Sequence, residues 1–202
     1  QAGVLRAAFR EYERTDDLAA LERAVLADHA ARLVGTLGSA ASDGAALLRF
    51  RHRETDEHNL LVALRLREAI ASGAAGTPPP TDTTLAGGTI PAAALATLTR
   101  AAPATIVAAV GRLGGGIWQG PLERWMTTGD LNALQRAFER QAVADVTALL
   151  VIGDPLAIDV PLAFTTATQV EARNLRLLGE AAARGIAAAV VHAELLWPDG
   201  RA

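Results

Sequence analysis

Apolar residues recur every three or four positions along most of the chain, the spacing that gathers them on one face of an α-helix. In the first part this pattern predicts helices over residues 4–13, 18–37 and about 45–71. Thr15 or Asp16 can cap the start of the second helix, and the glycines at 35 and 38 can end it. The pattern therefore favours an all-α fold.

A run of Gly, Pro and Thr over residues 72–84 interrupts the helical pattern. Three consecutive prolines remove backbone donors and clash with a preceding helical turn, so this run reads as a linker or long surface loop. Residues 85–118 alternate short helical runs with breakers. Longer helices are then predicted over about 121–127, 131–151, 160–183 and 187–196.

The chain contains an internal repeat. The segment TDDLAALERAV at residues 15–25 matches TGDLNALQRAF at residues 128–138 in Thr, Asp, Leu, Ala, Leu, Arg and Ala. An aromatic residue precedes each Thr by three positions, Tyr12 in one copy and Trp125 in the other. With a two-residue slip, the register continues so that Asn59 corresponds to Asn174. We therefore expect two related helical units, residues 1–84 with the Pro-rich linker and residues 85–202.

Composition limits the classes of function. All 19 basic residues are Arg and the net charge is −3, so no basic surplus points to nucleic acid. The chain has no cysteine, which excludes disulfides and thiolate metal sites. Asp and Pro residues interrupt the most apolar run, residues 142–164, so we expect no membrane span there. The chain starts at Gln1 without an initiator Met, and we expect that an upstream part was removed.

The segment RHRETDEHN at residues 51–59 offers the densest set of candidate metal ligands. One turn of helix separates His52 from Asp56 and Glu54 from His58, a spacing at which two side chains can share an ion. The second copy has no His at the corresponding positions. The segment is therefore interpreted as the solvated, salt-bridged outer face of a repeated helix, with a small metalloenzyme as a lesser alternative.

Four residues that recur in both copies form a structural repeat signature: Asp17, Asn59, Asp130 and Asn174. The two aspartates precede helices and are expected to cap them. Both asparagines lie on apolar helical stripes, and a helix–helix hydrogen bond would satisfy their amides. No arrangement typical of a catalytic centre emerges, and no cofactor or metal is expected. The glycines at 114–116 indicate a turn or hinge, and Gly153-Asp154-Pro155 indicates a helix stop.

The order of motifs resembles the C subunit of A/V-type ATPases, the family that includes the d subunit of the V-ATPase. The motifs in question are TGDL at 128–131, DPLAI at 154–158, EARNLR at 171–176 and GI at 185–186, and in the first copy TDDLAALERA, RETDEHNLLVALRLREA and LAGGTIPAAALATL. The resemblance covers nearly the whole chain. The chain departs from the family that it resembles in two ways. Family members have three related helical units, whereas this chain shows two. Glu180 and Ala182 also stand where the family often has basic residues.

The resemblance implies a non-catalytic coupling subunit. Family members form a funnel-shaped helical socket on the cytoplasmic face of the membrane rotor ring, where they receive the central shaft. The implied partners are the central-shaft subunits and the rotor-ring proteolipids, and the implied location is peripheral on the cytoplasmic side. We expect polar, Arg-rich contact surfaces. The repeat by itself would equally suit a helical protein-binding scaffold outside the ATPase.

Overall fold

The computed structural model describes residues 2–38, 44–73 and 84–197. These residues form α-helices and one short 3-10 helix, and the described part of the chain contains no β-strand. The fold is all-α, which confirms the expected class. The chain divides into two compact units, residues 1–102 and 103–202.

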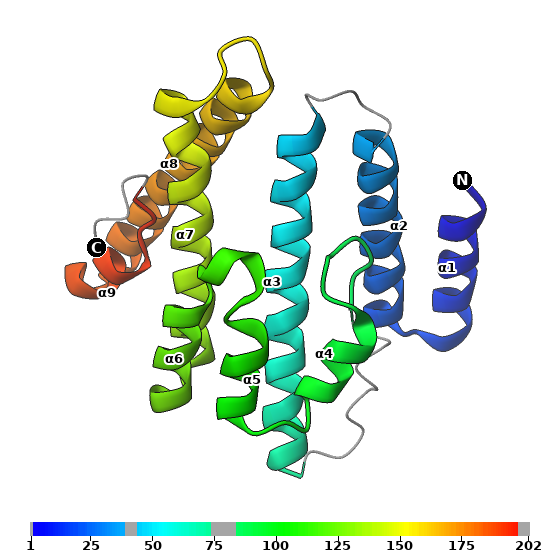
Figure 1. The fold of residues 1–202 in the computed structure, drawn as a ribbon. Helices are drawn as coiled ribbons and strands as arrows, with labels where there is room; N and C mark the ends of the chain where they lie inside the picture. Colours follow the sequence, from blue (N-terminus) through cyan, green and yellow to red (C-terminus); the bar gives the residue numbers. More distant parts are fainter. Residues whose placement is uncertain (1, 39–43, 74–83, 198–202) are drawn as a thin grey trace. The chain divides into compact units, whose positions relative to one another are not determined.

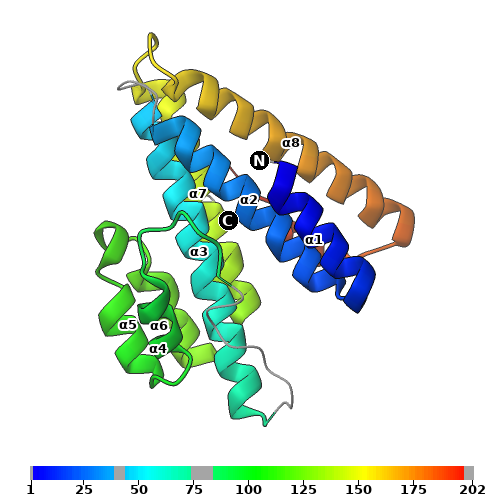
Figure 2. The ribbon, with the colours of Figure 1, turned by 90° about the vertical axis from the view of Figure 1, so that its right-hand side faces the viewer.

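The first unit has three helices that run up and down beside one another, followed by a short fourth (Figures 1 and 2). Their bounds are α1 Ala2–Thr15, α2 Leu18–Gly38, α3 Gly44–Ala71 and α4 Ala92–Leu98. Helix α2 packs between α1 and α3, and α4 packs on α3. Leu60, Ala63 and Leu64 of α3 are at most 1% exposed, so α3 is the central helix of this unit.

The second unit is built on an antiparallel pair of long helices, α7 Leu131–Ile152 and α8 Asp159–Arg184 (Figure 1). The helices α5 Pro103–Val110 and α6 Gln119–Thr128 precede them, with the 3-10 helix η2 Leu113–Gly116 between. A last helix, α9 Ala188–Glu194, packs on α8. Trp118 and Phe138 meet in the core, with ring centroids 6.3 Å apart in a tilted arrangement.

Glycines in the sequence explain where the two long helices of the second unit end. Gly153 ends α7 in an extended conformation, and the Asp154 side chain accepts a hydrogen bond from the amide of Leu156 at 2.9 Å. The predicted helix stop at Gly153-Asp154-Pro155 is therefore confirmed. Gly185 ends α8 with φ +65°, a left-handed conformation that glycine adopts without steric cost.

One helix boundary differs from the sequence prediction. Helix α9 ends at Glu194, where a helix to residue 196 was predicted, because Leu195 is extended with ψ 141°. The first compact unit extends to residue 102. The division of the sequence repeat itself remains a prediction. The predicted linker falls mostly on residues 74–83, outside the described residues.

Candidate functional site

In both copies of the repeat, an aspartate caps the N-terminus of a long helix in the same way. The Asp17 carboxylate accepts a hydrogen bond from the amide of Ala20 at 2.9 Å, and the Asp130 carboxylate accepts one from the amide of Ala133 at 2.9 Å. Each carboxylate thus satisfies an amide in the first turn that has no partner within the helix. An arginine six residues later lies 4.0 Å from the first carboxylate and 3.9 Å from the second.

The residue before each capping aspartate adopts a left-handed backbone. Asp16 has φ 54° and Gly129 has φ 69°. The amide of Asp16 donates to the carbonyl of Tyr12 at 2.8 Å, and the amide of Gly129 donates to that of Trp125 at 2.7 Å. The aromatic residues recognised in the repeat therefore mark the same turn in both copies.

Asn59 joins α3 to the segment that follows the linker. Its side-chain carbonyl accepts a hydrogen bond from the Leu85 amide at 2.7 Å, and its side-chain NH₂ donates to the Leu85 carbonyl at 2.9 Å. Asn59 is 1% exposed, so both bonds are shielded from water. A planar amide satisfies both backbone groups of one residue by this pairing.

Asn174 makes the same arrangement in the second unit. Its NH₂ donates to the Leu196 carbonyl at 2.7 Å, and its carbonyl accepts from the Leu196 amide at 3.2 Å. The predicted helix–helix hydrogen bond is therefore wrong for both asparagines. Each side chain instead binds the backbone of a leucine outside any helix, where both backbone groups are free to pair.

Asp56, like Asn59, attaches α3 by hydrogen bonds to the segment that follows the linker. Its carboxylate accepts hydrogen bonds from the Thr89 amide at 3.0 Å, the Thr89 hydroxyl at 2.6 Å and the Ile90 amide at 2.9 Å. A Cβ on Gly88 would lie 2.2 Å from one carboxylate oxygen, so only glycine lets the turn approach so closely. The fit around this buried carboxylate thus explains the glycine at position 88.

The interpretation of residues 51–59 as a solvated outer face is wrong at several positions. Asp56 is 2% and Glu57 is 7% exposed, while His52 contacts the carbonyl of Gly87 through its Nδ1. Glu57 pairs with Arg53 at 2.8 Å on the same helix. The segment therefore works mainly as an internal anchor for the chain after the linker.

The candidate metal ligands do not converge. Among the described residues, no group of three or more His, Cys, Asp or Glu side chains could hold a metal ion. Partial burial raises the pKa of Glu54, and the adjacent Arg51, 2.5 Å away, lowers it less. Partial burial and the nearby Arg65 both lower the pKa of His58. Burial and neighbouring arginines thus account for the direction of the pKa shifts of Glu54 and His58.

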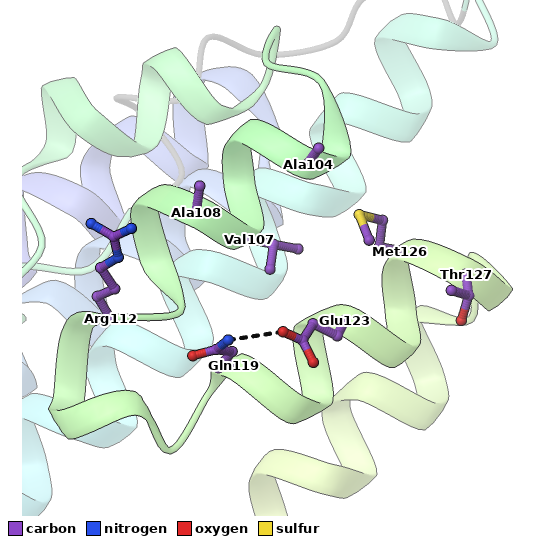
Figure 3. Close-up of a pocket in the computed structure, with 8 residues that line it drawn as sticks. All are labelled: Ala104, Val107, Ala108, Arg112, Gln119, Glu123, Met126 and Thr127. Atoms are coloured by element: carbon purple, nitrogen blue, oxygen red, sulfur yellow. Dashed lines mark hydrogen bonds between the residues drawn. The ribbon is translucent and has the colours of Figure 1, made fainter.

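A groove of about 480 Å³ lies between α5 and α6 (Figure 3). Val107 and Met126 supply apolar surface, and Arg112 extends at one end. The Gln119 amide donates a hydrogen bond to the Glu123 carboxylate at 2.9 Å across one helical turn. Thr127 also lines the groove, and its hydroxyl donates a hydrogen bond to the Arg124 carbonyl at 2.8 Å.

Comparison with known proteins decides the family. The family model described as ATP synthase (C/AC39) subunit matches residues 1–194. The chain belongs to this family. No curated protein and no solved structure matches the chain. The match confirms the resemblance to the C subunit of A/V-type ATPases.

Membership makes the protein a subunit of the A/V-type ATP synthase, in a family that is non-catalytic. In this structure the side chains of the repeat signature form hydrogen bonds with backbone groups: Asp17, Asn59, Asp130 and Asn174. Within the described ranges, no helix of this ATP synthase subunit is long and apolar enough to cross a bilayer. Sequence reasoning missed the role of Asp56, although its signal, a carboxylate on the stripe of Asn59, was present.

Proposed function

We propose that this ATP synthase subunit is the central-stalk element that links the rotor shaft to the membrane proteolipid ring. In this role it couples ATP hydrolysis or synthesis to the transport of protons or sodium ions. The observation that carries the proposal is the family match over residues 1–194. The proposed location is peripheral, on the cytoplasmic face of the membrane.

The long helices and the asparagine–backbone hydrogen bonds support a role in transmitting torque. Helices α3, α7 and α8 have 28, 22 and 26 residues, which correspond to lengths of about 33–42 Å. Asn59 and Asn174 attach non-helical segments to two of these helices by paired hydrogen bonds. Such ties oppose sliding of the segments along the helices, because both bonds would break together.

A basic groove in the second unit suits contact with an acidic partner. Its volume is about 430 Å³, and Arg124 of α6 and Arg140 of α7 line it together with alanines of α7. Arg140 donates a hydrogen bond to the Ala193 carbonyl, which fixes its position. Arg124 is exposed. We propose this groove as one of the Arg-rich contact surfaces, facing carboxylates of the shaft.

The experiment is reconstitution of the ATP synthase in vesicles with and without this subunit. We expect ATP-driven ion uptake to require the subunit, and the subunit to co-purify with both shaft and ring. Unchanged ion uptake per ATP hydrolysed in its absence would refute the coupling role. Arg124→Glu should weaken co-purification with the shaft, whereas Arg184→Glu, also an exposed helical arginine, should not.

A further inference from the structure

The chain that follows α8 packs back on this helix as α9. Gly185 makes the turn between the two helices with φ +65°. Residues 186–190 are exposed, and the first buried side chain after the turn is that of Val191. We call residues 186–197 the strap. The strap is thus joined to α8 by a glycine turn at one end and held on the helices only in its second half.

Three polar contacts within four residues attach the strap to α7 and α8: Asn174 with the Leu196 backbone, Arg140 with the Ala193 carbonyl, and Arg136 with the Glu194 carboxylate. The ion pair of Arg136 and Glu194 measures 3.0 Å, and its side chains are 30% and 39% exposed. Under these contacts, Leu196 meets Val143 and Val170 in a small apolar cluster. Partly exposed polar contacts therefore keep this cluster covered.

The corresponding segment of the first unit is attached by buried groups. Asn59 is 1% exposed, and Asp56, which binds the turn at residues 87–90, is 2% exposed. In the second unit Asn174 is half-buried, and Glu171, which stands at the position of Asp56, is exposed. Salt screens partly exposed charges much more than buried ones. We therefore expect salt to weaken the attachment of the strap and to leave that of the first unit unchanged.

Arg136 has a second carboxylate close by. Its Nη2 lies 3.9 Å from Oδ2 of Asp130, whose Oδ1 caps α7 at the Ala133 amide. The corresponding residues of the first unit, Arg23 and Asp17, form the same pair at 4.0 Å. An Arg136 side chain that separates from Glu194 therefore keeps an opposite charge beside it, which lowers the cost of releasing the strap.

We propose that the strap opens and closes on the α7–α8 pair, with Arg136 paired to Glu194 in the closed form and to Asp130 in the open form. Opening rotates the strap about the turn at Gly185 and exposes Val143 to water. Because Asp130 lies at the turn between α6 and α7, the charge at this turn controls how readily the strap opens. All of these contacts lie within the second unit, so the movement requires no partner.

The absence of native cysteine allows a direct test. Val143→Cys places a thiol under the strap, where the rate of maleimide labelling measures opening. The control is Ile106→Cys, 0% exposed in α5 of the same unit, which is labelled only when the whole unit unfolds. Raising the salt concentration from about 0.1 M to about 0.5 M should speed labelling at 143 by about twofold or more and change labelling at 106 little.

Two further substitutions in the Val143→Cys protein test the exchange of partners by Arg136. Glu194→Gln removes the closing ion pair and should speed labelling by about twofold to fivefold. Asp130→Ser keeps a side-chain oxygen that can cap α7 but removes the second partner of Arg136. Labelling should then slow by about twofold, because the open form loses its ion pair. Unchanged or faster labelling of the Asp130→Ser protein would overturn the exchange, since a merely structural Asp130 would favour the closed form.

Hydrogen exchange in the unsubstituted protein provides a second measurement. The Leu196 amide donates to Asn174 at 3.2 Å, and its counterpart, the Leu85 amide, donates to Asn59 at 2.7 Å. The same rise in salt should speed exchange of the Leu196 amide by about twofold and change that of the Leu85 amide little. Equal responses of the two amides, or equal salt dependence of labelling at 143 and 106, would show that the strap does not open by itself and would overturn the proposal.

Discussion

Asn59 and Leu85 are 26 residues apart, and two hydrogen bonds of 2.7 and 2.9 Å join the side chain of one to both backbone groups of the other. Because Asn59 is 1% exposed, no water replaces a lost bond. Asn59→Ala should therefore lower the free energy of unfolding by about 1–3 kcal/mol. Asn174→Ala should cost less, since Asn174 is only half-buried.

Urea denaturation followed by circular dichroism measures these differences. Asn132→Ala is the matched control, because Asn132 is an exposed helical asparagine, and it should change stability by about 0.5 kcal/mol or less. Equal losses for Asn59→Ala and Asn132→Ala would show that the tie contributes no stability.

Gly88 should not tolerate a methyl group. A Cβ there would stand 2.2 Å from Oδ1 and 3.1 Å from Cγ of Asp56, so either the turn or the carboxylate must shift and hydrogen bonds must break. We expect Gly88→Ala to destabilise the protein by about 2 kcal/mol or more. Gly179→Ala is the control, because Gly179 lies inside α8 with open space around its Cα. It should stabilise by about 0.5–1 kcal/mol, and thermal unfolding should separate the two variants in opposite directions.

The repeated turn gives a prediction about residue type. Gly129 has φ 69°, and the corresponding residue in the first copy is an aspartate at φ 54°. A short polar side chain tolerates this conformation, whereas a β-branched one does not. Gly129→Val should therefore cost more than Gly129→Asp, by about 1 kcal/mol. Equal melting temperatures for these two variants would contradict the role of the left-handed turn.

The sequence predicted the helices well because their determinants are local. Apolar spacing, Asp17 and Asp130 at helix starts, and glycines or Gly153-Asp154-Pro155 at helix ends all act within one or two turns. The internal repeat could also be detected in the sequence, because both copies form the same local turn and this turn requires the same residue types.

The burial of residues 51–59 could not be predicted from the sequence. Whether Asp56 faces water depends on residues 87–90, more than 30 positions away, and charge pattern alone favours a solvated face. The same holds for both asparagines: an apolar stripe predicts that the amide points inward, but not that it meets a single extended residue.

Glu54 provides a test by pH. Partial burial raises its pKa above the ordinary 4.5, and the attraction of Arg51 offsets only part of that effect. A carboxyl group whose pKa is higher in the folded state favours folding when protonated, and this contribution disappears as the pH rises through the folded-state pKa. Relative to Glu54→Gln, which cannot ionise, the wild-type protein should lose stability between about pH 4 and pH 7. Paired urea titrations at the two pH values measure the difference. A gain in relative stability with rising pH would mean that the ion pair with Arg51 outweighs burial.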